Sequence, residues 1–107
     1  MFLTEEEIVD NLISGIYMIS TKGKSQIAEL KSVPRKDMVK YYRTAGMYIR
    51  NEYKLWDIDN PLTQEWRNDR ILGNDRYMED GVDCHPYHPD AISMRILYAI
   101  WDKVNND

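Results

Sequence analysis

The sequence predicts an all-α fold, a compact bundle of about four to five helices with one long acidic loop. Three observations predict it: apolar residues recur at helical spacing in separate segments, helix-start signals precede those segments, and no stretch shows sustained alternation of apolar and polar residues. The chain has 107 residues, of which 43% are hydrophobic and 30% charged. This length and composition indicate a single helical domain over residues 1–107, with one modest core.

The first helix is expected from about Glu5 to Ile19. Thr4 and Glu7 match a capping box, in which each side chain accepts a hydrogen bond from the backbone N–H of the other residue. Apolar residues then follow at helical spacing: Ile8, Leu12, Ile16 and Ile19. A short helix is expected next, around residues 26–31.

The third helix is expected from near Pro34 to Tyr53, with the proline in its first turn. One broad face collects apolar and aromatic residues: Met38, Tyr41, Tyr42, Ala45, Gly46, Tyr48, Ile49 and Tyr53. The opposite face is basic: Lys36, Lys40, Arg43, Arg50 and Lys54. A glycine inside a helix costs about 1 kcal/mol relative to alanine, so we expect another backbone or a large ring to approach Gly46 closely.

Two further helices follow a turn. Asn60 as N-cap, with Pro61 at the first helical position, predicts a short helix through Arg67. Residues 69–87 hold five acids and show little periodicity, so we expect a long loop there, of a kind that is often functional. The last helix begins at residues 88–90 with a proline and an acid, and its core positions are Ile92, Ile96, Ile100 and Val104.

Cysteine usage and hydropathy predict a cytoplasmic protein. Cys84 is the single cysteine, so no disulfide can form within the chain, which fits a reducing compartment. Residues 1–7 are acidic where a secretory signal would be basic, and no apolar run approaches the ~20 residues needed to span a bilayer. We therefore expect no membrane partner.

Charge is unevenly distributed along the chain. The net charge is −4, from 14 basic and 18 acidic residues. Residues 22–54 carry nine basic residues against three acids, whereas residues 57–90 carry three arginines against nine acids. This asymmetry either steers binding partners or is neutralised where the two halves meet in the fold.

Residues 83–88 contain one cysteine and two histidines, side chains that Zn²⁺ favours. A structural zinc site normally takes four ligands from two separated pairs, and no second pair is present. We therefore expect no cofactor and no metal, with Cys84, His85 and His88 as the alternative metal ligands. Under the favoured interpretation His88 caps the last helix and Cys84 packs as a small hydrophobic residue; a nucleophilic role for Cys84 is the least favoured.

A sparse pattern runs through the second half of the chain. It comprises Gly-x-x-Ile-Arg-Asn at residues 46–51, Leu-Trp at residues 55–56, and His-Pro-Asp-x-x-Ser at residues 88–93. Over Pro34 to Val104 this pattern resembles an uncharacterised family of short helical proteins from bacteria and their phages. Two features depart from it: Ala91 stands where the family often has a second acid, and the 69–87 loop is longer. The resemblance implies a shared helical fold and fits a phage-encoded accessory protein acting in the host cytoplasm; it implies no activity.

The residues of this pattern can meet where two helix ends cross. We expect Arg50 and Asp90 to form a bidentate pair beneath Trp56, with His88 and Ser93 hydrogen bonding in the same cluster. The favoured interpretation is a structural clasp between the two helix ends. The alternative is an anion or substrate pocket built from Arg50, Asn51, His88 and Ser93.

Three function classes remain, and we expect no enzymatic activity. The first is an accessory protein that binds and modulates or inhibits a protein partner, because the chain has eight tyrosines, three tryptophans and six methionines, and aromatic residues and methionine are enriched at interfaces. The candidate partner-binding residues are Lys36, Lys40, Arg43, Met47, Tyr77, Met78 and Tyr87. The alternatives are nucleic-acid binding through the basic face of the third helix and, last, a small enzyme or anion-binding protein using Arg50, His88 and Asp90. Homodimerisation is also expected.

Overall fold

The computed structural model describes residues 2–18, 30–73 and 77–105. In chain order its elements are α1 (Glu5–Met18), the 3-10 helix η1 (Arg35–Tyr41), α3 (Ala45–Glu52), the 3-10 helix η2 (Pro61–Thr63), α4 (Gln64–Ile71), strands β1 (Met78–Glu79) and β2 (Val82–Asp83), and α5 (Pro89–Asn105). Most of the short helix expected around residues 26–31 lies outside the described residues. The fold is mainly helical, as predicted, but not strictly all-α.

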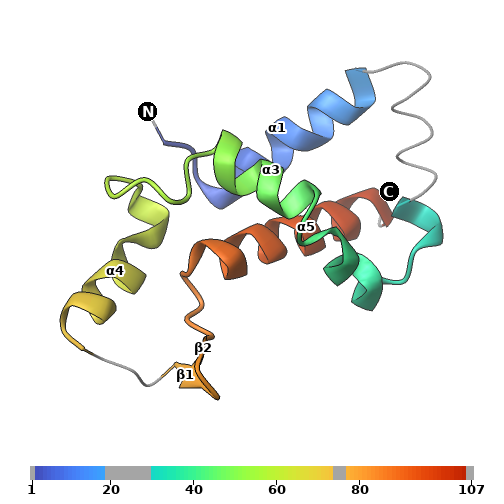
Figure 1. The fold of residues 1–107 in the computed structure, drawn as a ribbon. Coiled ribbons are helices and arrows are strands. Elements are labelled where there is room, and N and C mark those ends of the chain that lie inside the picture. Colours follow the sequence, from blue (N-terminus) through green and yellow to red (C-terminus); the bar gives the residue numbers. More distant parts are fainter. Residues whose placement is uncertain (1, 19–29, 74–76, 106–107) are drawn as a thin grey trace.

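The hydrophobic core is built around α5, against which α1, α3 and η1 all pack (Figure 1). Its buried members are Ile8, Val9, Val33, Met38, Ile49, Leu55, Ile92, Ile96, Leu97, Ile100 and Val104. The four core positions predicted on the last helix are all among them. Neither α4 nor the β1–β2 hairpin contributes a residue to this cluster. In Figure 1 these two elements lie to one side of the packed helices.

The start of α1 confirms the predicted capping box. The Thr4 backbone N–H donates to Glu7 Oε1 at 3.0 Å, and the Glu7 backbone N–H donates to Thr4 Oγ1 at 3.1 Å. Two donors that the first helical turn leaves without helical partners are thereby satisfied.

The prediction of one continuous helix from Pro34 to Tyr53 is wrong. After η1, residues 42–44 form a turn and α3 begins at Ala45. The turn leaves the Tyr42 carbonyl available, and Arg50 Nη2 donates to it at 3.1 Å. The break also changes the rotation of α3 about its axis, so Arg50, expected on the basic face, is buried, and Tyr48, expected on the apolar face, is 55% exposed.

The close approach predicted at Gly46 is present, but no ring makes it. A Cβ added at this glycine would lie 3.1 Å from Arg50 Nη1 and 3.4 Å from the Tyr41 carbonyl oxygen. A backbone carbonyl and a buried guanidinium therefore take the space that a side chain would need.

The turn before α4 follows the predicted capping pattern. Asn60 Oδ1 accepts a hydrogen bond from the Leu62 backbone N–H at 2.9 Å, and Pro61 occupies the first position of η2. The Asn60 amide also donates to the carbonyls of Tyr53 and Lys54, at 3.2 and 3.0 Å. The helix continues to Ile71, beyond the predicted end at Arg67.

Residues 69–87 are not a loop throughout, because α4 covers their start and a hairpin forms within them. Asp80 and Gly81 connect the strands with φ of 52° and 79°, and two consecutive positive φ angles are typical of a type I′ turn. Met78 pairs with Asp83 and Glu79 pairs with Val82. Paired residues share a face of a hairpin, so the side chains of Met78 and Asp83 lie on one face and those of Glu79 and Val82 on the other.

Candidate functional site

Arg50 forms a cluster with Tyr42, Asp90 and Ser93, which we call the arginine cluster. Arg50 is 6% exposed; its Nη1 donates to Ser93 Oγ at 3.0 Å and its Nε lies 3.5 Å from Asp90 Oδ1. Asp90 also accepts from the Tyr42 hydroxyl at 2.6 Å, and this hydrogen bond raises the pKa of Tyr42. The contact expected between Arg50 and Asp90 is therefore present, through one nitrogen rather than as a bidentate pair.

Trp56 and Asn51, which the sequence predicted in this cluster, lie elsewhere. The ring against the Arg50 guanidinium is that of Tyr42, with its centroid 4.5 Å from Cζ. Trp56 is half exposed and makes edge contacts with the rings of His88 and Trp66, at centroid distances of 5.5 and 6.1 Å. The side chain of Asn51 is exposed.

His88 caps α5, as predicted from the sequence. Its Nδ1 accepts a hydrogen bond from the Asp90 backbone N–H at 3.0 Å. Its ring packs edge-on to Trp66 at 4.8 Å. Burial lowers the pKa of His88 and outweighs the opposing effect of the nearby Asp90 carboxylate. The cap therefore carries a neutral imidazole at neutral pH.

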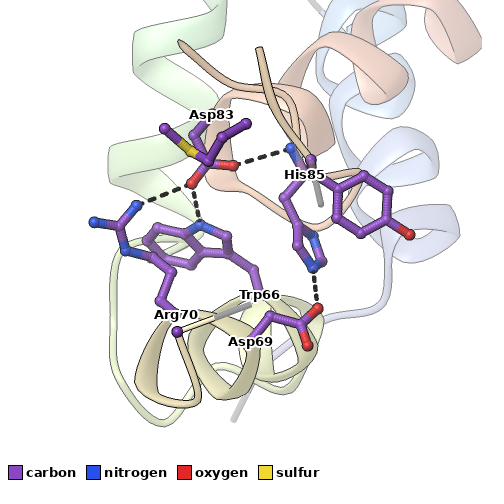
Figure 2. Close-up of a pocket in the computed structure, with 8 residues that line it drawn as sticks. Trp66, Asp69, Arg70, Asp83 and His85 are labelled. Carbon is purple, nitrogen blue, oxygen red and sulfur yellow. Dashed lines mark hydrogen bonds and ion pairs between the residues drawn. The ribbon is translucent and has the colours of Figure 1, made fainter. Parts of the chain in front are cut away.

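A surface pocket of about 260 Å³ lies between α4 and the hairpin segment. We call it the α4–hairpin pocket, and it is lined by Trp66, Asp69, Arg70, Gly73, Tyr77, Met78, Asp83 and His85. The four lining residues on and just after α4 have the spacing i, i+3, i+4 and i+7, which places them on one helix face. Figure 2 shows side chains from α4 meeting Asp83 and His85 from the facing segment.

Asp83 joins the two walls of the pocket. Its Oδ2 accepts from Trp66 Nε1 at 2.8 Å and from Arg70 Nη1 at 3.0 Å, while its Oδ1 accepts from the His85 backbone N–H at 3.0 Å (Figure 2). Burial alone would raise the pKa of this carboxyl group, but the three hydrogen bonds together lower it below the ordinary 3.8. Asp83 is thus a fixed negative charge at neutral pH.

His85 and Asp69 form the second link across the pocket. His85 Nε2 lies 2.7 Å from Asp69 Oδ2, and His85 Nδ1 accepts from the Tyr87 backbone N–H at 3.0 Å. Because a nitrogen that accepts a hydrogen bond carries no proton, the ring proton sits on Nε2, which donates a hydrogen bond to Asp69 Oδ2. Both ring nitrogens are therefore engaged, and His85 has no nitrogen left to act as a general base.

The candidate metal ligands do not form a site in the described part of the chain. Both ring nitrogens of His85 have partners, and Nδ1 of His88 is the cap of α5. Cys84 is exposed, so the expectation that it packs as a small hydrophobic residue is wrong. Among residues 2–18, 30–73 and 77–105, no three His, Cys, Asp or Glu side chains are placed to hold a metal ion.

The predicted partner-binding residues divide between two surfaces. Lys36 and Lys40 are exposed on η1, with Arg43 in the following turn and Met47 on α3. Tyr77 and Met78 line the α4–hairpin pocket, and Tyr87 is exposed beyond it. Ile71 and Leu72, at the end of α4, are also largely exposed, and the sequence did not predict them as binding residues.

Asp69 and Asp83 were missed as pocket residues. The spacing of Trp66, Asp69, Arg70 and Gly73 was the available signal for the α4 wall. The Asp80-Gly81 pair between strand-forming residues was the signal for the hairpin that carries Asp83.

The geometry defines a small helical protein with a preformed, polar-walled pocket on its surface. No family model matches the chain, and no curated protein or solved structure is significantly similar to it. Within the described residues, no helix is both long enough and apolar enough to cross a membrane.

Proposed function

We propose that this protein acts by binding a protein partner at the surface formed by the C-terminal end of α4 and the α4–hairpin pocket. The observation that carries this proposal is the exposure of Ile71 and Leu72, which are 83% and 79% exposed side by side at the end of α4. Gly73, the next residue, lines the pocket, as does Met78. Apolar side chains around a polar recess are the composition of a binding surface.

The pocket walls support this proposal because they are held in place before any partner arrives. Asp83 accepts three hydrogen bonds, and Asp69 accepts one from His85 Nε2. A preorganised surface loses less conformational entropy on binding than one that must order itself.

The two alternative functions, nucleic-acid binding and enzymatic activity, have less support. Nucleic-acid binding was predicted from a continuous basic face, but η1 and α3 are separate helices and Arg50 is buried. The small-enzyme alternative needs Arg50 and Asp90 to face a substrate. Their polar atoms instead contact Ser93 and Tyr42.

Affinity capture with matched variants tests the proposal. We expect tagged protein to retain a specific protein from lysate of its native host, and the double variant Ile71→Ser/Leu72→Ser to lose it. Val39→Ser is the control, because Val39 is also exposed (58%) but lies on η1. The proposal fails if the double variant captures the same proteins as the native chain, or if both variants lose them equally.

A further inference from the structure

His88 joins the N-terminal end of α5 to α4. Its side chain is 14% exposed, and its ring lies edge-on to the rings of Trp66 and Trp56, with centroids 4.8 and 5.5 Å away. Trp66 is the buried residue of α4. Because α4 and the hairpin contribute no residue to the hydrophobic cluster around α5, the contact between Trp66 and His88 attaches this region to α5.

The same ring caps α5, and only its neutral form can do so. His88 Nδ1 accepts a hydrogen bond from the Asp90 backbone N–H at 3.0 Å. An imidazolium ring carries a proton on both nitrogens and accepts no hydrogen bond. Protonation would also place a positive charge at the N-terminal end of a 17-residue helix, where the helix dipole disfavours a cation. A proton on His88 therefore removes the cap and opposes the seating of the ring.

Burial lowers the pKa of His88, and charged groups on four elements modify that effect. Asp90 on α5, with Oδ2 3.8 Å from Nδ1, and Asp83 on β2 favour a charged ring. Arg70 on α4 and Arg50 on α3 oppose it. Two carboxylates thus act against two guanidinium groups, and burial decides the direction. The seated ring binds a proton less readily than an exposed histidine does.

The links between α4 and the hairpin segment do not share this sensitivity to mild acid. Asp83 accepts from Trp66 Nε1 at 2.8 Å and from Arg70 Nη1 at 3.0 Å (Figure 2). Although burial alone would raise it, these hydrogen bonds hold the pKa of Asp83 below 3.8. Between about pH 5 and 7 Asp83 stays charged, so α4 and the hairpin remain joined to each other while their attachment at His88 weakens.

We propose that His88 is an acid-sensitive switch for the partner-binding surface, and that its protonation releases α4 and the hairpin from the N-terminal end of α5. Ile71 and Leu72 lie at the end of the released helix. This inference rests on the proposed function for the identity of that surface. It adds the regulation of the surface by pH.

Hydrogen–deuterium exchange of the intact protein at about pH 7.5 and pH 5.0 tests the inference, with each rate corrected for the intrinsic effect of pH. The amides of residues 64–71 and 78–83 report the equilibrium constant for release of this region. We expect that constant to rise at least about threefold at the lower pH. It should rise at most about 30-fold, the limit when only the released form is protonated with the ordinary pKa of 6.5.

Two results of the exchange experiment overturn the inference. A rise below about threefold shows that His88 stays in place when α4 opens. Equal protection of residues 64–71 and the middle of α5 at both pH values shows that the region opens only when the whole chain unfolds.

Two matched variants locate the switch through the ratio of release between the two pH values. His88→Asn retains an oxygen that accepts from the Asp90 N–H but takes up no proton in this range, so the ratio should fall below about twofold. His85→Asn retains an acceptor for the Tyr87 N–H, which His85 Nδ1 holds at 3.0 Å, and should leave the ratio within about twofold of the native value. A native ratio in His88→Asn, or its loss in His85→Asn, contradicts the assignment.

An NMR titration of the native chain gives a measurement that needs no variant. The signal of the carbon-bound proton between the two ring nitrogens of His88 should titrate with a midpoint below 6.5. A midpoint at or above 6.5 overturns the inference, because protonation would then not favour release.

The outcomes separate this inference from the function on which it rests. If capture depends on Ile71 and Leu72 but the exchange ratio is unchanged by His88→Asn, the switch is wrong and the partner surface stands. If exchange follows His88 but capture ignores Ile71 and Leu72, the acid-sensitive release stands and the partner surface is wrong.

Discussion

Replacing Arg50 with methionine tests whether the arginine cluster holds α3 to α5. The substitution removes the donors to Ser93 Oγ and to the Tyr42 carbonyl, at 3.0 and 3.1 Å, and the contact with Asp90 at 3.5 Å. Methionine retains most of the apolar volume of the side chain, so the change is mainly a loss of polar contacts.

The loss in the free energy of unfolding can be estimated from the contacts that Ser93, Tyr42 and Asp90 lose when Arg50 is replaced. Two hydrogen bonds to a buried charge contribute ~1.5–3 kcal/mol each. Asp90 is 37% exposed and keeps its hydrogen bond from Tyr42, so its ion pair with Arg50 adds at most about 1 kcal/mol. Burial of the methionine side chain returns about 1–2 kcal/mol. We therefore expect Arg50→Met to lower the free energy of unfolding by ~1–6 kcal/mol.

Urea unfolding followed by circular dichroism measures this loss, and the melting temperature should fall by ~4–8 °C for each kcal/mol. Lys36→Met is the matched control, because Lys36 is exposed on η1, and it should change stability by less than about 0.5 kcal/mol. An Arg50→Met protein as stable as the native chain would refute the clasp and return Arg50 to the candidates for ligand binding.

Three further predictions follow from local geometry. Gly46→Ala should destabilise the native chain, because its Cβ would lie 3.1 Å from Arg50 Nη1, but should stabilise the Arg50→Met variant by about 1 kcal/mol; double-mutant analysis of urea unfolding checks the reversal of sign. Burial lowers the pKa of His88 below 6.5, so as the pH falls the unfolded chain binds a proton at His88 before the folded chain does. The contribution of His88 to the free energy of unfolding should therefore be fully present above pH 6.5 and be lost as the pH decreases towards the pKa of the folded state. His88→Asn, which retains a capping side chain, should reduce that slope, and an unchanged slope would contradict the assignment. Thr4→Ala should cost about 1 kcal/mol by thermal unfolding, because the Glu7 N–H loses its 3.1 Å partner; a cost near zero would show that the cap contributes nothing.

The sequence alone was sufficient to predict a hydrogen bond where its donor and acceptor both lie within one short segment. The capping box at Thr4 and Glu7, the Asn60 cap and the His88 cap each join residues two or three positions apart. Such hydrogen bonds depend on local spacing and on little else. The Arg50–Asp90 contact, 40 residues apart in the chain, was found only because both residues stand at helix ends that were themselves correctly placed.

Sequence was insufficient where a long-range contact decides the local structure. Helical periodicity continues through residues 42–44, yet the chain turns there and the freed Tyr42 carbonyl meets the buried Arg50. The α4–hairpin pocket also depends on contacts between residues far apart in the sequence. Asp69 pairs with His85 across 16 positions, and Trp66 pairs with Asp83 across 17. No periodicity encodes such pairs, although the Asp80-Gly81 turn that brings Asp83 into place could have been found in the sequence.

The absence of α4 and the hairpin from the hydrophobic cluster around α5 has a consequence for how the protein opens. Hydrogen bonds such as those from Trp66 and Arg70 to Asp83 connect α4 to the hairpin, whereas apolar side chains surround α5 on several sides. Amide protons of residues 64–71 and 78–83 should therefore exchange with deuterium well before those in the middle of α5. A partner bound at the end of α4 would slow that early exchange and leave the late exchange of α5 almost unchanged.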